Sequence, residues 1–264
     1  MQKFSKIYAL SSFTLMGMLF AAPSWAGDKI ACDQAGPQAP RDIQSPTGTN
    51  AIQFSKAPPA SEMHLCDIHF HKYAEHRASG YTELVGKGDH RGYICNGSHP
   101  VIDVAQEHGE GHGHQASGCP GIAPGDTIEV HWVFTTCDVA PAPSLGSCFS
   151  DACVNPELRV EARVFLLTDD GSGEDFLNYR ADTGKLPKAL EPVEYIGSTT
   201  GPGYNDGTCS PYQVTWQVSS ACTPLEISTV QSWCETDHNP FHENHAHGVR
   251  RLVEDPALLS PIKD

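Results

Sequence analysis

Polar and apolar positions alternate along several short segments of the chain, a pattern typical of β-strands. Residues 127–135 read Thr-Ile-Glu-Val-His-Trp-Val-Phe-Thr, and residues 158–167 alternate at first and then become apolar. Successive side chains of a strand point to opposite faces, so such segments can bury one face or both in a sheet. Further strands are expected at residues 64–71, 194–197 and 212–218.

Helical periodicity is almost absent. A helical turn is expected near residues 182–190, and residues 228–234 are compatible with either a strand or a helical turn. The 24 glycines and 20 prolines are spread along the chain and interrupt every longer run. We therefore predict a single mainly β domain with long loops and a few short helices.

The first 26 residues have the features of an export signal. Lys3 and Lys6 precede the apolar residues 7–22, and Ser24-Trp-Ala26 ends the segment with small residues where cleavage requires them. No other apolar run approaches the roughly 20 residues that cross a bilayer. We expect a periplasmic or secreted protein without a membrane span once residues 1–26 are removed. An irregular arm is expected over residues 27–62, and the folded domain over residues 63–264.

All ten cysteines follow the expected signal. An even, scattered set in an exported chain predicts disulfide bonds, up to five of them, in an oxidising compartment. The sequence leaves the pairing open, although Cys148 and Cys153 could close a small loop. Because no Cys-x-x-Cys pair occurs, we expect neither a zinc ribbon nor a thioredoxin-type site.

The formal net charge is −15, and removing the signal, which carries two lysines and no acid, makes the remaining chain more acidic still. Nucleic-acid phosphates would repel such a surface, so no nucleic-acid partner is expected. A Gly-x-Ser-x-Gly motif and a glycine-rich phosphate loop are both absent from the sequence. The sequence leaves the oligomeric state open.

The most informative segment is Cys66-Asp-Ile-His-Phe-His71. On a strand, Asp67, His69 and His71 share one face, and Cys66 is expected to point to the other. Two histidines two residues apart have α-carbons about 6–7 Å apart, so their side chains can converge on one metal ion. A catalytic zinc site needs three protein ligands and one open position, which requires a third ligand from elsewhere.

His131 is the best candidate for that third ligand. It lies in the middle of an apolar strand, and a buried histidine needs a polar partner, which a metal would supply. Each expected ligand strand also carries a carboxylate two residues before a histidine, namely Asp67 and Glu129. Such carboxylates can accept a hydrogen bond from the far ring N–H and fix the tautomer of the ligand.

Glu75 and His76 come directly after the first ligand strand. We predict catalytic roles for both: one would orient the nucleophile through a hydrogen bond, and the other would act in the second shell or in proton transfer. The alternative is that they simply pair with nearby charges such as Arg77. His76 is also the reserve ligand if His131 does not bind the metal.

The segment Cys66-Asp-Ile-His-Phe-His-Lys-Tyr-Ala-Glu-His-Arg77 resembles the signature of delta-class carbonic anhydrases, and the chain is identified as a bacterial, exported member of that family. Residues 129–137 and 244–253 are similar to it too, so the resemblance spans most of residues 60–255. It implies a catalytic domain over residues 63–264.

The resemblance also implies a function. Zn²⁺ would be bound by His69, His71 and His131, and carbon dioxide would be hydrated reversibly to bicarbonate by a zinc-bound hydroxide. Carbon dioxide and bicarbonate are then the small-molecule partners, and Val133, which shares the face of His131, is a candidate for the apolar wall of the site. Alpha-class carbonic anhydrases have a similar layout, with His-x-His on one strand and the third ligand on a neighbouring strand.

Two alternatives are open, and the first uses the same residues. In cupins a metal is bound by His-x-His, a following Glu and a later His, an order that His69, His71, Glu75 and His131 match. Residues 61–66 lack the glycine that precedes that motif, and ten cysteines are unusual for cupins. Glu75 would be a direct ligand in a cupin.

The other alternative is a non-enzymatic periplasmic zinc-binding protein. It would use two histidine-rich tracts, one containing His108, His112 and His114 and one containing His242, His245 and His247. The roles of both tracts are open at this stage, although His245 and His247 could instead approach the metal site.

Overall fold

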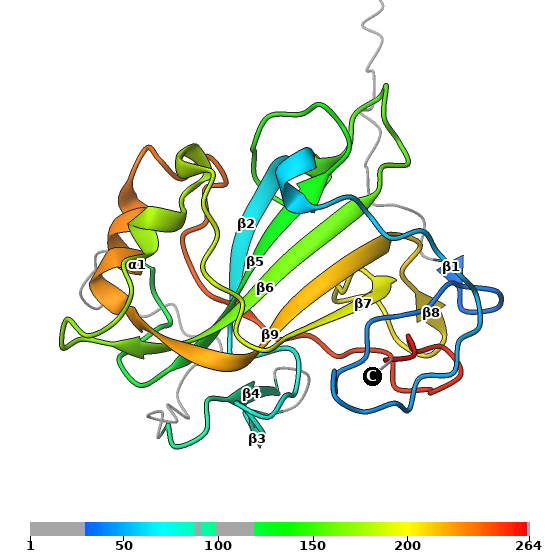
Figure 1. The fold of residues 1–264 in the computed structure, drawn as a ribbon, viewed down its shortest axis with the longest axis horizontal. Helices are drawn as coiled ribbons and strands as arrows, with labels where there is room; N and C mark the ends of the chain where they lie inside the picture. Colours follow the sequence, from blue (N-terminus) through cyan, green and yellow to red (C-terminus); the bar gives the residue numbers. More distant parts are fainter. Residues whose placement is uncertain (1–29, 88–90, 99–118, 263–264) are drawn as a thin grey trace, which may run out of the picture.

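A computed structural model describes residues 30–87, 91–98 and 119–262 (Figure 1). The expected signal over residues 1–26 lies outside the described residues. So do His108, His112 and His114 of the glycine- and histidine-rich loop.

A six-stranded mixed sheet forms the centre of the molecule, in the order β10-β2-β5-β6-β9-β7. Neighbouring strands are antiparallel except in two pairs, β6 with β9 and β10 with β2, which are parallel. The mainly β prediction is confirmed, and all five expected strands are present. Their bounds are β2 (His64–Lys72), β5 (Thr127–Thr135), β6 (Leu158–Thr168), β7 (Pro192–Ser198) and β9 (Gln213–Glu226), with β10 (His247–Gly248) added at the edge.

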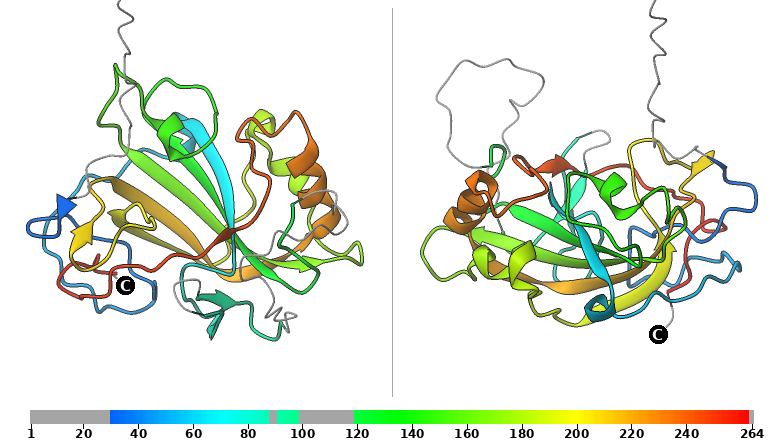
Figure 2. Two further views of the ribbon diagram at one scale, coloured as in Figure 1. Left: turned by 180° about the vertical axis from the view of Figure 1, so that it is seen from behind. Right: turned by 90° about the horizontal axis from the view of Figure 1, so that it is seen from above.

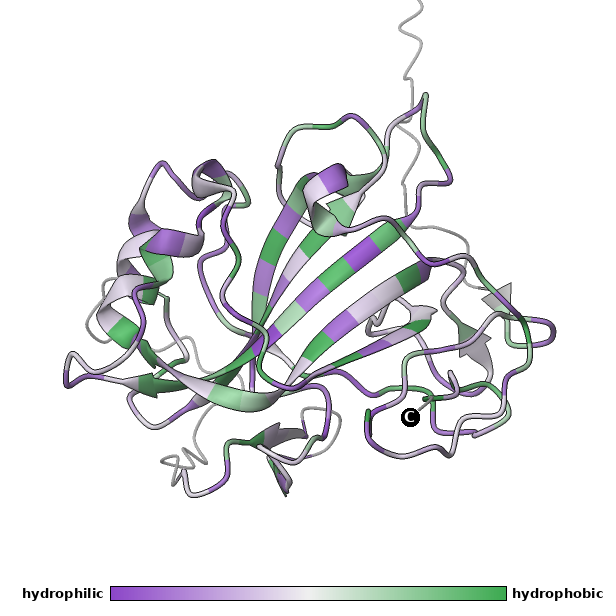
Figure 3. Ribbon diagram, in the orientation of Figure 1, coloured by the Kyte–Doolittle hydropathy of each residue, from purple (hydrophilic) through white to green (hydrophobic). Residues whose placement is uncertain are grey.

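Each face of this sheet is covered, which explains why all nine residues of β5 are buried. On one face Ile68, Phe70 and Trp132 pack against the helical elements α1 (Ile227–Glu235) and η3 (Phe176–Tyr179). Figure 2 shows these elements gathered beside one face of the sheet. The opposite face contributes a second cluster, with members such as Val133, Ala162 and Trp216. Figure 3 shows the alternation of polar and apolar residues along the strands.

Cys66 departs from the expected alternation. The register between β2 and β5 shifts between Leu65 and Asp67, and this irregularity changes which side a residue faces. Cys66 therefore packs in the cluster that contains Val133, not with Ile68 and Phe70 as strict alternation predicts.

The two expected helical segments have different outcomes. Residues 228–234 lie within α1, whose buried residues Ile227, Val230 and Trp233 repeat every three positions along one face. The turn expected at residues 182–190 is limited to η4 (Ala181–Thr183), because Gly184 adopts a left-handed conformation at its end and Pro187 follows. The other short helices are η1 (Ala60–Glu62) and η2 (Leu145–Cys148).

Five disulfide bonds pair all ten cysteines, which confirms the prediction of a disulfide-stabilised fold. The suggested Cys148–Cys153 loop is wrong. η2 places Cys148 beside Cys66 of β2, whereas Cys153 reaches Cys137 just beyond the end of β5. The remaining pairs are Cys32–Cys209, Cys95–Cys222 and Cys119–Cys234. Five such bonds fit an oxidising, extracellular environment.

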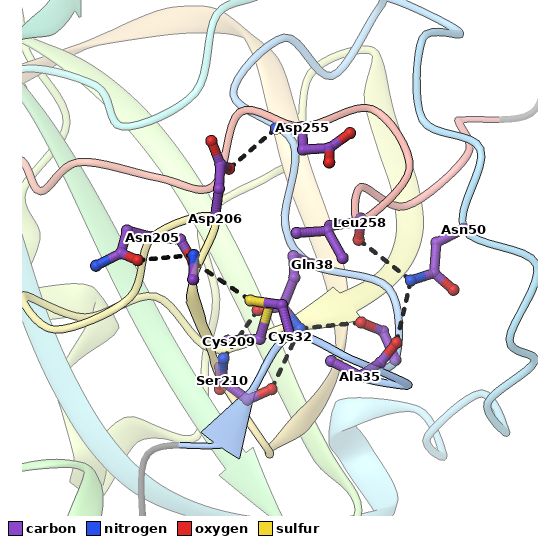
Figure 4. The surroundings of a disulfide bond; sticks show 12 residues. Cys32, Ala35, Gln38, Asn50, Asn205, Asp206, Cys209, Ser210, Asp255 and Leu258 are labelled. Atoms are coloured by element: carbon purple, nitrogen blue, oxygen red, sulfur yellow. Dashed lines mark hydrogen bonds between the residues drawn. A yellow bond between two sulfur atoms is a disulfide. The ribbon is translucent and has the colours of Figure 1, made fainter.

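The N-terminal described segment is attached to distant parts of the chain (Figure 4). β1 (Ile30–Ala31) pairs with β8 (Thr208–Cys209) beside the Cys32–Cys209 disulfide. The side-chain amide of Asn50 donates to the carbonyl oxygens of Ala35 and Leu258, which ties the segment to the C-terminal region. The boundary expected at residues 62 and 63 stays a prediction.

A hairpin of β3 (Glu83–Val85) and β4 (Gly92–Ile94) follows strand β2. Gly92 lies against the backbone after β2, where a Cβ atom would approach the Cβ of Tyr73 to 2.6 Å. A larger residue at position 92 would therefore push the hairpin away. None of the helices in the described part of the chain has the length and apolar character needed to cross a membrane.

Candidate metal centre

The register of β2 and β5 brings three histidines together. His69 pairs directly with His131 across the antiparallel ladder, and His71 pairs with Glu129. The possible ligand nitrogens of His69, His71 and His131 all lie within 4.8 Å of one another, and the ring centroids are 5.0–5.3 Å apart. These are the three histidines that strand alternation selects in the sequence.

An oxygen atom lies near the far nitrogen of each of the three rings. Asp67 Oδ2 is 2.8 Å from Nδ1 of His69, and Glu129 Oε1 is 3.3 Å from Nε2 of His131. The two carboxylates predicted to orient the ligands thus lie beside the expected rings. For His71 the neighbouring oxygen is the backbone carbonyl of Gly248, 3.4 Å from Nδ1.

This arrangement fits a cation. When the far nitrogens carry their protons toward these oxygens, the near nitrogens present lone pairs: Nε2 of His69, Nε2 of His71 and Nδ1 of His131. Two of these atoms, Nε2 of His69 and Nδ1 of His131, are only 3.2 Å apart. Two facing lone pairs repel each other unless a proton or a metal ion lies between them, and three converging imidazoles are a donor set that Zn²⁺ accepts.

Burial and neighbouring charges shift the pKa values of His71, His69 and Glu129 in different directions. Burial, followed by the neighbouring charges of His131 and His69, holds the pKa of His71 well below its usual value, which favours the neutral ligand form. For His69 burial also lowers the pKa, but the carboxylate of Asp67 outweighs it and the pKa is raised. Burial would raise the pKa of Glu129, yet His76 and His131 lower it well below the usual range. Glu129 is therefore ionised at neutral pH.

Glu129 is the centre of a fully buried hydrogen-bond network. Its Oε1 is 2.7 Å from Nδ1 of His76, and its Oε2 accepts hydrogen bonds from the backbone N–H groups of Glu75 and His76. Nε2 of His76 is 2.8 Å from the hydroxyl of Tyr195. Both ring nitrogens of His76 thus have protein partners, and His76 is not part of the three-histidine cluster.

Glu75 is also fully buried, and it contacts a residue that the sequence did not bring to notice. The hydroxyl of Thr200 donates to its carboxylate, at 3.0 Å from Oε1 and 3.2 Å from Oε2. Glu75 does not join the cluster of possible metal ligands among the described residues, so the four-ligand arrangement of a cupin is not formed. A threonine in a loop after β7 carries no sequence pattern that could have revealed this contact.

Part of the C-terminal tract reaches the centre. His247 of β10 pairs with His71 of β2, and its ring centroid lies 6.0 Å from those of both His69 and His71. The ring of His245 lies next to it at 4.8 Å and is exposed, as is His242. Of the tail histidines whose roles were open, His247 lies beside the three-histidine cluster and His245 lies one step further out.

Comparison with known families adds a decisive observation. A family model described as delta carbonic anhydrase matches residues 60–229, well over half of the chain. The chain belongs to the delta carbonic anhydrase family. The family is named for carbonic anhydrase activity, the reversible hydration of carbon dioxide. Membership of this family does not support the cupin and the non-enzymatic alternatives. The family match ends before the segment that contributes Gly248 and His247.

Solved structures of other carbonic anhydrases are similar only at a low level. A halotolerant carbonic anhydrase from Dunaliella salina is 18% identical over 48% of this chain and 52% of its own, with a TM-score of 0.25. The chain therefore spans about half the length of that relative. The alpha-carbonic anhydrase of Thermovibrio ammonificans, solved with sulfanilamide, is 12% identical over 83% and 87% of the two chains, with a TM-score of 0.25. That of Photobacterium profundum is 15% identical over 84% and 91%, with a TM-score of 0.27. No curated protein matches the chain.

Proposed function

We propose that this chain hydrates carbon dioxide reversibly, as a zinc-dependent carbonic anhydrase whose metal ligands are His69, His71 and His131. The observation that carries the proposal is the 3.2 Å approach of Nε2 of His69 to Nδ1 of His131, with a carboxylate oxygen near the far nitrogen of each ring. Zn²⁺ on three neutral imidazoles lowers the pKa of a bound water to about 7 and so supplies hydroxide at neutral pH.

Asp67 keeps the ring of His69 in the required tautomer, and the charge of Glu129, 3.3 Å from Nε2 of His131, favours a proton on that nitrogen. Both are buried, so each carboxylate retains most of its electrostatic strength. His76 supports Glu129, because its ring bonds to Oε1, the oxygen that also lies near His131, and its backbone N–H bonds to Oε2. We therefore assign His76 a positioning role, since its buried ring is engaged at both nitrogens.

Glu75 acts through Thr200. Because the hydroxyl proton of Thr200 is directed to Glu75, its oxygen is left as an acceptor only. A hydroxyl held in this way accepts a hydrogen bond from a nucleophile that carries a proton. It disfavours the binding, at the same position, of a group that has no proton to donate. Orientation of the nucleophile by Glu75 through Thr200 is thus the catalytic role we assign to this pair.

Carbon dioxide is apolar, and the surface beside the ligands suits it. Val133 lies on the face of His131 one step along β5 and is buried, and the ring of Trp216 is 5.3 Å from that of His131. We assign these two side chains to the wall that holds the substrate. Ten paired cysteines and the signal-like first 26 residues support a periplasmic or secreted location.

The test is zinc content and carbon dioxide hydration measured together on the purified protein without residues 1–26. One zinc per chain is expected, with activity lost on chelation and restored by zinc. His71→Ala should lose both zinc and activity. A His71→Ala protein that keeps both would overturn the assignment.

A deletion separates the enzyme site from the histidine-rich loop. Removing residues 107–115 should leave one tightly bound zinc and the hydration activity unchanged. Loss of the tightly bound zinc in this deletion would place the metal in the loop and contradict the three-histidine site.

A further inference from the structure

We propose that the C-terminal segment of residues 239–248, which lies beyond the family-matched residues, is a working part of the metal centre, with Glu243 as its positioning residue. The inference rests on the proposed zinc site. Glu243 is 7% exposed and its carboxylate contacts two partners. Oε1 accepts a hydrogen bond from the backbone N–H of Phe70 at 3.1 Å, and Oε2 lies 3.0 Å from Nε2 of His247.

The first contact lies between two of the ligands. Phe70 separates His69 from His71 on β2, and its backbone N–H points away from β5 toward the edge of the sheet. β10 pairs with β2 only at His71 and Lys72, so the Glu243 carboxylate takes the place of a strand at Phe70. A buried N–H without a partner costs free energy, and an ionised acceptor makes a particularly strong bond to it. Glu243 therefore fixes the backbone that carries both histidines.

The carboxylate is itself held in position. The side-chain amide of Asn239 donates to the backbone carbonyl of Glu243 at 2.6 Å and accepts from its N–H at 3.3 Å. Phe241, between them, is buried in the cluster that contains Trp233. The turn is thus held by the buried ring of Phe241 and by the hydrogen bonds of Asn239, and the Glu243 carboxylate extends from it to the backbone of β2.

The second contact leads to His71. Glu243 holds the ring of His247, and the next residue, Gly248, offers its carbonyl to Nδ1 of His71 at 3.4 Å. This carbonyl does for His71 what Asp67 does for His69, leaving Nε2 free to face the metal. The orientation of one ligand of the three therefore depends on a segment at the other end of the chain.

A zinc-affinity measurement tests the proposal. In Glu243→Gln the negative charge is lost and only the amide oxygen can accept, so the bond to the Phe70 N–H loses its charge assistance and the His247 ring keeps its contact only by presenting an unprotonated Nε2 to the amide N–H. Loss of an outer hydrogen-bond partner typically weakens metal binding by about 10–100-fold. We expect a rise of that size in the zinc Kd, measured by chelator competition, and a changed visible spectrum of the cobalt-substituted protein. Glu235→Gln, at an exposed position at the end of α1, should behave as wild type.

A second variant covers the case in which Glu243→Gln does not fold. Asn239→Ala loosens the turn without touching the carboxylate and should raise the zinc Kd several-fold. Wild-type zinc affinity and an unchanged cobalt spectrum in either folded variant would overturn the role of Glu243 while leaving the zinc site in place. A wild-type protein that binds no zinc, or whose zinc survives in His131→Ala, would overturn the zinc site and this inference with it.

Discussion

His69 and His131 face each other across the β2–β5 ladder, with Nε2 of one ring 3.2 Å from Nδ1 of the other. This contact depends on the register of two antiparallel strands. A slip by one residue would turn one of the two rings to the opposite face of the sheet. The three candidate ligands are therefore all carried by the central sheet and not by its loops.

Replacing His131 by Ala should remove the metal site. Loss of a residue that only hydrogen-bonds to a ligand weakens metal binding by up to roughly 100-fold. Since His131 is a direct ligand in the proposed site, its loss should lower the zinc affinity by more than that. Chelator competition gives the affinity, and stopped-flow carbon dioxide hydration gives the activity. His64→Ala, at an exposed position on β2, is the matched control and should keep both. Full zinc content in His131→Ala would rule out this ligand.

The Thr200–Glu75 pair should affect catalysis and leave the metal bound. Thr200→Val and Glu75→Gln are each expected to lower kcat/KM by about 100-fold, the order seen when one positioned hydrogen bond to the reacting group is removed. Zinc content should stay at one per chain in both. Thr200→Ser restores the hydroxyl and should recover most of the activity. If Glu75→Gln instead loses its zinc, Glu75 is a ligand and the proposed role is wrong.

Acid should destabilise the protein partly through Glu194 on β7. Burial raises the pKa of this carboxyl, but hydrogen bonds from Lys56 and Arg159 outweigh it, so the pKa in the folded protein lies below the ordinary 4.5. The ionised Glu194 carboxylate therefore contributes its full stabilisation above about pH 4.5, the pKa of the unfolded chain. This contribution to the free energy of unfolding is lost as the pH falls through the lower pKa of the folded protein. Thermal midpoints between pH 7 and pH 3 should fall less steeply in Glu194→Gln than in wild type.

Glu83→Gln, at an exposed position on β3, is the control for that series and should follow the wild-type curve. Parallel curves for wild type and Glu194→Gln would contradict the role of Glu194.

The disulfides should differ in what they contribute. Cys95–Cys222 closes a loop with a sequence separation of 127 residues, whereas Cys137–Cys153 has a separation of 16. Chain entropy gives about 5 kcal/mol for the first loop and about 3 kcal/mol for the second. Replacing each pair by alanine should therefore lower the free energy of unfolding more for Cys95–Cys222, as measured by urea denaturation. Equal losses would show that chain entropy does not control these bonds.

Alternation along single strands predicts much of the site. It places Asp67, His69 and His71 on one face of β2 and Glu129 with His131 on one face of β5, because the side-chain period of a strand is fixed. Burial of a histidine in the middle of an apolar strand identifies the third candidate ligand. The strands themselves are recognisable for the same reason.

The remaining contacts depend on relationships that no local pattern encodes. A two-residue period does not say which strands are neighbours, so the parallel β10–β2 pairing and the Gly248 carbonyl could not be foreseen. The irregular register at Leu65 reverses the expected side of Cys66. Thr200 reaches Glu75 from 125 residues away. The cysteine pairs likewise join distant segments, and the one local pair that spacing suggested does not form.

The pairing of β10 with β2 has a consequence for how the molecule is made. His71 and Gly248 are 177 residues apart, so β2 emerges from the ribosome long before the segment that covers its edge. Until the C-terminal segment arrives, one side of β2 presents unpaired N–H and C=O groups on which another chain can add as a strand. A fragment that ends before residue 239 should therefore aggregate during synthesis, even though it contains all three candidate ligands.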